Sequence, residues 1–249
     1  MKGIAILGAT GGLGEAIALR LGKRAPVSIG YGRNKDKATE LVATIEKAGG
    51  TARIAPVDLR DAGSVAAFID GAARAWNGLD GIVSATGPAI PLRPLSEVGE
   101  EDFRRIYDTD VFGSFNVLRH GAAALKQTGG GAIVLLLTTA VLRTLENDGM
   151  SGGPKTAVAA LMKQMAREMG RHNIRCNGIA PGVINAGIVH SSFEVDLVAK
   201  AVITDCLAKT PLGRMGEPED IAAAVDFLTS AGATYISGQI LAIDGGYSA

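Results

Sequence analysis

Three glycines near the N-terminus could form a phosphate-binding turn. Gly8, Gly12 and Gly14 lie in the stretch GATGGLG, directly after the apolar run Ile4–Leu7. Glycine lets a backbone turn sharply and approach a pyrophosphate, and the helix that follows presents free N–H groups to it. The spacing G-x-x-x-G-x-G differs from the commonest dinucleotide fingerprint, and a tight strand–helix turn without a ligand is the alternative. We interpret the stretch as a nucleotide-binding loop.

The residues after the second apolar run, Val27–Gly30, indicate which dinucleotide such a loop would hold. A site that prefers NAD usually carries an acid there, which bonds the 2′-hydroxyl of the ribose. Arg33, Asn34 and Lys35 occupy this stretch instead, and no acid occurs before Asp36. Because a guanidinium pairs well with a phosphate, NADP(H) is predicted in preference to NAD(H). The alternative is a solvated charge run at the start of a helix.

Short β-rich runs alternate with longer helical patterns, which predicts parallel strands joined by crossover helices. Strands are expected at Ile4–Leu7, Val27–Gly30, Arg53–Pro56, Gly81–Ser84, Ala132–Thr138, Ile174–Ile179 and Gln239–Ile243. Helices are expected near Leu13–Lys23, Lys35–Ala48, Ala62–Trp76, Phe103–Lys126, Lys155–Gly170 and Glu219–Thr229. The predicted fold class is α/β, a Rossmann-like, doubly wound sheet of seven parallel strands with helices on both faces. Ligands on such sheets bind beyond the carboxyl ends of the strands.

One dinucleotide-binding domain is expected over residues 1–249, because no linker or repeat interrupts the pattern. The region at about 183–210 has no strand signal and is long for a connection, which is typical of a lid over a substrate. Ile188, Val189, Phe193 and Val195 in this region suggest an apolar substrate pocket.

Bulk composition excludes several classes of function. The formal net charge is +0, so the basic footprint of a nucleic-acid-binding protein is missing. The longest apolar run, Ala132–Leu137, is far too short to span a membrane. The start MKGIAILGATGG is expected to form a first strand and not a signal peptide. Cys176 and Cys206 have no metal-ligand spacing, so no metal site is predicted, and both are expected to be buried thiols of a cytoplasmic protein.

Several stretches together resemble the short-chain dehydrogenase/reductase family over essentially the whole chain. GATGGLG resembles the family's cofactor loop, with Leu7 where threonine is usual; VDLRD resembles its adenine-contacting motif; CNGIAPGVI resembles the motif that approaches the nicotinamide. The C-terminal stretch from PLGRMGEPEDIAAAVDFL to IDGG is similar almost residue for residue. The resemblance implies a nicotinamide cofactor and a small-molecule substrate. The residues implied to contact the cofactor are Gly8, Thr10, Gly12, Leu13, Gly14, Arg33, Asn34, Asp58, Leu59, Ser84, Gly87, Lys155, Pro181, Gly182 and Val183.

The family's catalytic Asn-Ser-Tyr-Lys set is only partly matched. Asp110 in DVFG stands where the asparagine is usual, and Thr138 in LLLTTA stands where the serine is usual. SGGPK replaces Y-x-x-x-K, which keeps Lys155 but puts Ser151 in place of the tyrosine. SATG follows the fourth strand where N-N-A-G is usual, and Ala186 replaces a threonine after the P-G motif.

The loss of a phenol matters because that group exchanges the proton on the substrate oxygen in the family. A serine hydroxyl is a much weaker acid and a shorter side chain, so Ser151 cannot simply replace it. Pro154 is expected to start the helix that carries Lys155, which would leave Ser151 in the preceding turn as a capping or loop residue. Lys155 is expected to bind the nicotinamide ribose, with a solvated lysine as the alternative.

Other groups are candidates for the proton. Asp110 could act as an acid or base, pair with Lys155, or be satisfied by backbone groups, and Thr138 could bond a substrate oxygen or simply fill a strand position. The loop RTLENDGM offers Glu146, Asn147 and Asp148, although a solvated turn is favoured there. His190 in the lid titrates in the useful range, but lid histidines are usually not catalytic.

The predicted function is an atypical NADP(H)-dependent oxidoreductase for a small, apolar carbonyl or alcohol substrate. The alternatives are a regulatory or scaffold protein that binds the dinucleotide without turnover, and a non-redox enzyme on the same fold. The resemblance also implies a homo-oligomer, a tetramer or dimer, packed through the helices near Phe103–Lys126 and Lys155–Gly170.

Overall fold

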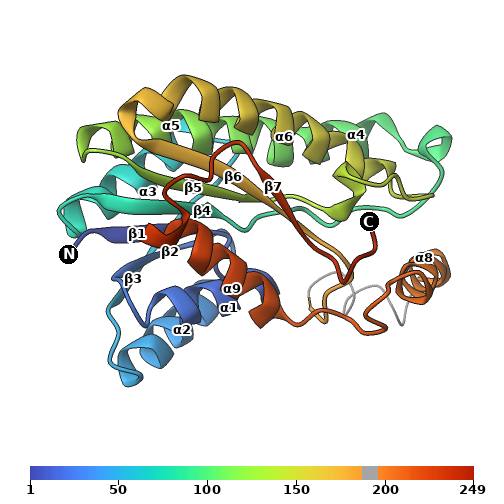
Figure 1. Ribbon diagram of the computed structural model, residues 1–249, viewed down its shortest axis with the longest axis horizontal. Coiled ribbons are helices and arrows are strands. Elements are labelled where there is room, and N and C mark those ends of the chain that lie inside the picture. The colour runs from blue at the N-terminus through green and yellow to red at the C-terminus, as the bar shows by residue number, and fades with distance from the viewer. Residues whose placement is uncertain (187–195) are drawn as a thin grey trace.

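A parallel sheet of seven strands runs through the molecule in the order β3-β2-β1-β4-β5-β6-β7. The computed structural model describes residues 1–186 and 196–249 (Figure 1). The strands are β1 (Gly3–Leu7), β2 (Val27–Tyr31), β3 (Ala52–Pro56), β4 (Leu79–Ser84), β5 (Gly131–Leu136), β6 (Ile174–Pro181) and β7 (Ile240–Ile243). The predicted fold class and all seven predicted strands are confirmed, with small shifts at their ends.

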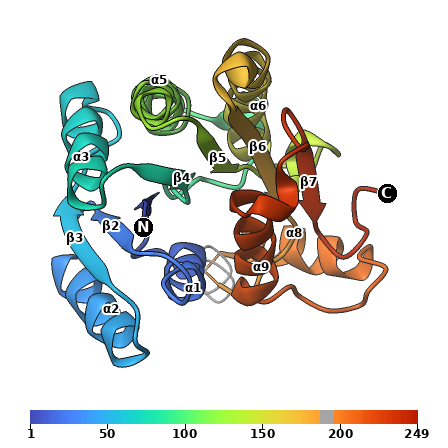
Figure 2. The same ribbon diagram turned by 60° about the vertical axis from the view of Figure 1, so that its left-hand side comes forward.

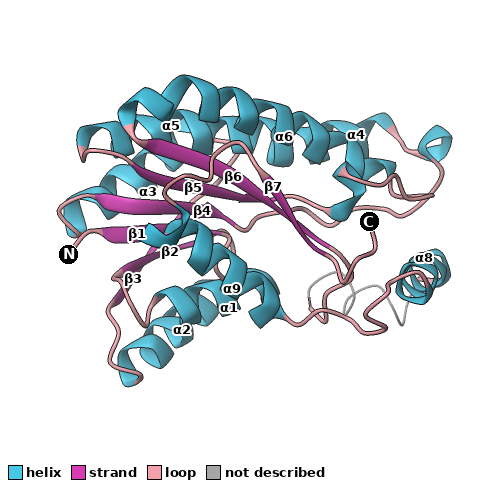
Figure 3. Cartoon of the chain, in the orientation of Figure 1, coloured by secondary structure: helices cyan, strands magenta, loops and turns pink. Residues whose placement is uncertain are grey.

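Helices cover both faces of the sheet, which explains why its strands are nearly continuous apolar runs. Figure 2 shows α1, α2 and α9 against one face and α3, α5 and α6 against the other. Figure 3 separates the helices from the strands by colour. The helices are α1 (Gly12–Leu21), α2 (Lys35–Lys47), α3 (Ala62–Ala75), α4 (Glu100–Tyr107), α5 (Gly113–Gln127), α6 (Gly149–Met169), α8 (Leu197–Ala208) and α9 (Pro218–Thr229).

Successive residues of a strand point to opposite faces of the sheet and pack in two separate hydrophobic cores. In β1, Ala5 and Leu7 pack with α3 and α5, whereas Ile4 and Ile6 pack with α1 and α9. The parallel register places Leu7 opposite Ser84 of the neighbouring strand β4, so the carboxyl ends of the central strands meet at one edge of the sheet. None of the described helices is long and apolar enough to cross a bilayer. Cys176 and Cys206 are free and buried, as predicted.

The helix expected near Phe103–Lys126 changes its hydrogen-bond pattern part-way along. Between α4 and α5 the chain forms a π-helical turn, η2 (Asp108–Phe112), whose only buried residue is Asp110. A π turn adds a residue to the helical repeat and re-aims the side chains within it. The predicted helical stretch is therefore confirmed, whereas the π turn that carries a candidate site residue was not predicted.

Two other helix predictions need correction. The helix that carries Lys155 begins at Gly149, not near Pro154, so Pro154 lies inside α6 and Ser151 lies in its first turn. The segment predicted as a connection at 183–210 contains helix α8. His190, Ile188, Val189, Phe193 and Val195 lie outside the described residues.

Candidate active site

A cavity of about 350 Å³ opens at the carboxyl edge of the sheet, which is where a doubly wound sheet is expected to bind a ligand. Its size is within the range of small-molecule sites. One wall comes from the loops after β1, β4 and β6, and another from α6 and α8. Most of the lining is apolar, including Leu13, Ile90, Leu92, Leu145, Val202 and Ile203.

The glycine loop after β1 borders this cavity with Gly11, Gly12 and Leu13. Gly8 has a left-handed backbone, φ +79, and a Cβ on Gly14 would come within 2.2 Å of the Gly8 carbonyl oxygen. These glycines let α1 pack tightly against the end of β1. Gly11 is the N-cap of α1 and has no side chain to bond the first-turn N–H groups. The loop therefore fits a pyrophosphate at the helix N-terminus.

A buried ion pair forms the floor of the cavity. The Lys155 ammonium lies 3.1 Å from Asp110 Oδ1 and also donates to the Thr86 carbonyl oxygen at 3.2 Å. Lys155 is 8% exposed and Asp110 3%. Burial raises the pKa of Asp110, and the neighbouring ammonium opposes that shift. The pairing predicted as one alternative for Asp110 is confirmed, and the alternative of a solvated lysine is wrong.

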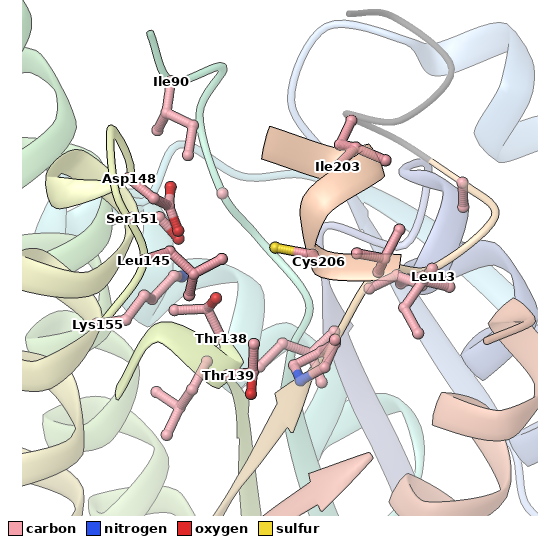
Figure 4. Close-up of a pocket in the computed structure, with 18 of the residues that line it drawn as sticks. Leu13, Ile90, Thr138, Thr139, Leu145, Asp148, Ser151, Lys155, Ile203 and Cys206 are labelled. Atoms are coloured by element: carbon pink, nitrogen blue, oxygen red, sulfur yellow. The ribbon is translucent and has the colours of Figure 1, made fainter. Parts of the chain in front are cut away.

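Ser151 and Asp148 stand at the start of α6 on the same wall. Ser151 lies one helical turn before Lys155, so the two side chains share a face of the helix. Figure 4 shows the Asp148 carboxyl beside Ser151, with Thr138 and Lys155 deeper in the cavity. Burial raises the pKa of Asp148 to about 7, against a hydrogen bond with the Ser151 side chain.

This arrangement corrects two predictions. Asp148 is 9% exposed and lines the cavity, so the solvated turn favoured for it from the sequence is wrong. Glu146 of the same loop is exposed and does not line the cavity. Asp148 occupies the N-cap position of α6 without a side-chain cap bond, and the helix begins at Gly149, so Ser151 is not in the preceding turn.

Thr138 lies just beyond the end of β5, which closes at Leu136 and not at Thr138 as predicted. Its hydroxyl oxygen accepts a hydrogen bond from the Ala140 N–H at 3.3 Å. The hydroxyl hydrogen is therefore left to donate into the cavity that Thr138 lines. The neighbouring Thr139 instead donates to Asp244 at 2.8 Å, which ties the end of β5 to the C-terminal tail.

The sequence-predicted site residues divide into two groups. Those that border the cavity are Gly12, Leu13, Gly87, Asp110, Thr138, Ser151, Lys155, Pro181, Gly182 and Val183. Those that lie outside its lining are Gly8, Thr10, Gly14, Arg33, Asn34, Asp58, Leu59 and Ser84. Ser84 bonds Thr86 at 3.0 Å. Asn34 caps α2 by accepting from the Lys37 N–H, and Asp58 pairs with Arg60, which lowers the pKa of Asp58.

Many of the residues that line the cavity were not predicted from the sequence, among them Gly11, Cys206 and Tyr247. Gly11 could have been found, because it adjoins the glycines already selected. Tyr247 directly follows the IDGG stretch and Cys206 lies shortly before PLGRMGEPED, but neither motif indicates a cavity residue at these positions, and only the fold brings them to this wall. Burial raises the pKa of both groups.

Comparisons with known proteins agree with this geometry. A family profile described as enoyl-(acyl carrier protein) reductase matches residues 8–248. The 7alpha-hydroxysteroid dehydrogenase of Escherichia coli (strain K12) is 32% identical over 241 residues, covering 97% of this chain and 92% of that protein. The chain belongs to the short-chain dehydrogenase/reductase family.

Solved structures of short-chain dehydrogenase/reductases share the whole fold. One from Mycobacterium ulcerans superposes with a TM-score of 0.91 at 32% identity, covering 99% of this chain and 90% of that one. A 7 alpha-hydroxysteroid dehydrogenase complexed with NADH and 7-oxo glycochenodeoxycholic acid superposes with a TM-score of 0.86 at 32% identity, covering 98% and 93%. This chain is accordingly an oxidoreductase of the short-chain dehydrogenase/reductase type.

Proposed function

We propose that the chain is an NADP(H)-dependent oxidoreductase that interconverts a small, neutral, apolar carbonyl compound and its alcohol. The observation that carries this proposal is the convergence of three parts on one cavity. The open glycine loop, the buried Lys155 and the stretch Pro181–Val183 all border it, and apolar side chains form the rest of its wall. In this family such a cavity holds the cofactor and the substrate together.

The residues present fit a nicotinamide dinucleotide. Gly11, Gly12 and Leu13 would hold the pyrophosphate, Lys155 would bind the nicotinamide ribose, and Pro181–Val183 would lie along the nicotinamide. Such a cofactor supplies or accepts the hydride. Val202, Ile203 and Cys206 of α8 line the cavity, which supports a role for the segment at about 183–210 as a cover over the substrate.

Arg33 supports the choice of NADP(H). It follows β2 at the carboxyl edge, is exposed, and pairs with no carboxylate in the described part of the chain. A free guanidinium there is available to a 2′-phosphate, whereas a 2′-hydroxyl would call for an acid.

The substrate class follows from the charges in the cavity. Lys155 is neutralised by Asp110, and the remaining lining is mainly apolar. An ionic substrate would lose its hydration without gaining a free counter-charge. A neutral ketone or alcohol is therefore the best fit. The reaction would proceed with Ser151 at the position where the family usually has a tyrosine.

Cofactor affinity gives a first test. Titration calorimetry should show tighter binding of NADPH than of NADH. Arg33→Ala should raise the Kd for NADPH by about 10–100-fold, because a charged hydrogen bond is worth about 1.5–3 kcal/mol, and leave the Kd for NADH nearly unchanged. Arg74→Ala, an exposed arginine in the last turn of α3, is the matched control. Equal affinity for both cofactors in all three proteins would contradict the NADP(H) preference.

Turnover gives the second test. NADPH absorbance would be followed with a panel of neutral ketones that includes cyclohexanone and 1-tetralone. Consumption of NADPH with formation of the alcohol is the expected result. Tight NADPH binding without consumption of any ketone would favour a dinucleotide-binding regulatory protein, and product formed without NADPH consumption would favour a non-redox enzyme.

A further inference from the structure

Asp148 begins α6 without acting as a cap for it. An aspartate at this position usually accepts hydrogen bonds from the first-turn N–H groups, yet the Asp148 side chain makes no such bond. Asn147, which precedes it, has a left-handed backbone with φ 61. After this turn the Asp148 carboxyl lies in the cavity wall beside Ser151 (Figure 4). The first turn of α6 therefore lacks a side-chain cap, and the Asp148 carboxyl lines the cavity.

No described residue offers a free cation to this acid. Among the described residues that line the cavity, Lys155 is the only one with a positive charge, and its ammonium is bound to Asp110 and to the Thr86 carbonyl. Ile90 and Leu145 line the same cavity near it (Figure 4). A buried carboxyl without a cation favours its neutral form.

In the described part of the chain, the other titratable groups facing this space are Cys206 on α8 and Tyr247 in the C-terminal tail. Burial raises the pKa of each, so both are neutral at physiological pH and neither stabilises an Asp148 carboxylate. Arg143 lies over the face of the Tyr247 ring, 4.7 Å from its centroid, and donates to the Tyr247 backbone carbonyl. Its charge is thus directed at the tail and not at Asp148.

We propose that Asp148, acting through the hydroxyl of Ser151, donates the proton to the carbonyl oxygen during reduction and takes it back during alcohol oxidation. This inference rests on the proposed function, since it assigns the acid for that reaction. The Ser151 side chain lies beside the Asp148 carboxyl (Figure 4) and shares a helical face with Lys155, so it connects the acid with the deeper part of the cavity. Thr138 donates to the same substrate oxygen and holds it in place.

The reduction balances as follows. The substrate carbon receives a hydride, with its two electrons, from the reduced nicotinamide dinucleotide, which is oxidised. The O–H bond of Ser151 breaks as the new O–H bond forms on the substrate oxygen, and Ser151 Oγ takes the proton of the Asp148 carboxyl. Asp148 is left as a carboxylate and regains a proton from solvent, because its pKa of about 7 lies near neutral pH.

The test is single-turnover oxidation of NADPH by cyclohexanone in the full chain. Asp148→Asn should slow the reduction by about 10²–10⁴-fold, the usual worth of a positioned acid, without changing the Kd for NADPH. Ser151→Ala should slow it similarly, and Ser151→Thr should restore part of the rate. Glu146→Gln, which alters an exposed carboxyl two residues away, should leave the rate unchanged.

The pH dependence of the reduction rate distinguishes a chemical role of Asp148 from a purely structural one. The wild-type reduction rate should fall as pH rises through about 7, whereas Asp148→Asn should lack that inflection. Infrared difference spectra of wild type against Asp148→Asn give a readout without substrate. They should contain the carbonyl band of a protonated carboxylic acid below neutral pH and lose it above.

Three outcomes overturn this inference alone. The first is an active wild type with Asp148→Asn at the same rate and with the same pH profile. The second is loss of activity in Tyr247→Phe, but not in Asp148→Asn, which would make the tyrosine the donor. The third is absence of the protonated-acid band from the infrared spectra. A wild type that binds NADPH but reduces no ketone overturns both this inference and the proposed function.

Discussion

Asp110 and Asp148 line the same cavity but have different partners, and this difference sets their roles. Asp110 has the Lys155 ammonium at 3.1 Å, so its ionised form is compensated despite burial. Asp148 has the Ser151 hydroxyl beside it instead of a cation, and burial has the largest effect on its pKa. A carboxyl with a cation serves as a fixed negative charge, whereas one without a cation can hold a proton at neutral pH.

Removing the carboxylate of the buried pair should destabilise the protein. Asp110→Ala leaves the Lys155 ammonium buried without a counter-charge, and we expect the free energy of unfolding to fall by about 3 kcal/mol or more. Urea denaturation measures the change. Asp108→Ala, which removes an exposed carboxylate from the same π turn, should have little effect.

A double variant tests whether the loss comes from the stranded charge. Adding Lys155→Met to Asp110→Ala removes the uncompensated ammonium and should recover a large part of the lost stability. No recovery in the double variant would show that the effect of Asp110→Ala is one of packing in the π turn.

Asp148 should make stability depend on pH in a defined direction. Its pKa is raised to about 7 in the folded protein from an ordinary value of 3.8, so the folded state binds the proton more tightly than the unfolded chain. The free energy of unfolding should therefore fall as pH rises from about 4 to 7, by up to roughly 4 kcal/mol from this residue, and change little above 7.

Asp148→Asn isolates that contribution. The difference in unfolding free energy, variant minus wild type, should grow between about pH 4 and pH 7 in favour of the variant, because asparagine cannot ionise. Denaturation of both proteins across this range measures it. A difference that does not vary with pH would mean that Asp148 titrates like an exposed carboxyl.

At the scale of elements, the start of α6 depends on an unusual sequence. Pro154 lies inside the helix, where it lacks an N–H and crowds the preceding turn. A residue before proline is normally kept out of the helical conformation by contact between its Cβ and the proline ring. Gly153 has no Cβ, which lets the helix extend back to Gly149 and carry Ser151 in its first turn.

The effect of Gly153→Ala should consequently depend on residue 154. A Cβ at position 153 would lie 3.5 Å from the Tyr107 hydroxyl, an ordinary contact. In a Pro154→Ala background we expect Gly153→Ala to stabilise by about 0.5–1 kcal/mol; in the native background the clash with proline should cancel that gain. Equal stabilisation in both backgrounds, measured by urea denaturation, would refute this account of the helix start.

Elements with a strong local pattern could be predicted from the sequence, and elements set by distant contacts could not. The seven strands and the glycine loop follow from apolar runs that end in glycine or polar residues. The π turn has no local signal, because Asp110 is drawn inward by Lys155, 45 positions later in the chain. The start of α6 was predicted too late, near Pro154, because glycine and proline each disfavour the interior of a helix when considered alone, and Gly152 and Gly153 precede that proline.

At the scale of the molecule, the cavity is assembled from segments that span the chain. Gly11 lies near its beginning and Tyr247 near its end, and both border the same space. The cavity positions of Gly12, Leu13 and Pro181–Val183 could be predicted because these residues belong to contiguous motifs. The proton-donating side could not, since the burial of Asp148 depends on how α6, α8 and the tail pack together.

Apolar side chains on the outside of α4, the π turn η2 and α5 form a surface through which we propose that copies of the chain associate. Phe103, Phe112 and Phe115 are 42%, 60% and 44% exposed. Sedimentation velocity should therefore detect a dimer or tetramer, and the pair Phe112→Glu and Phe115→Glu should shift it toward the monomer by placing charge in an apolar contact. Ala43→Glu on α2, across the sheet, is the control. A monomeric wild type would refute the proposal.

The C-terminal tail is held at the cavity by several bonds. Asp244 accepts from the Thr139 hydroxyl and from the N–H groups of Gly246 and Ser248, while Tyr247 contributes to the wall. The N-terminus emerges at the opposite edge of the sheet (Figure 1). An affinity tag fused after Ala249 would start beside the catalytic wall, so recombinant protein intended for kinetics should carry its tag ahead of Met1.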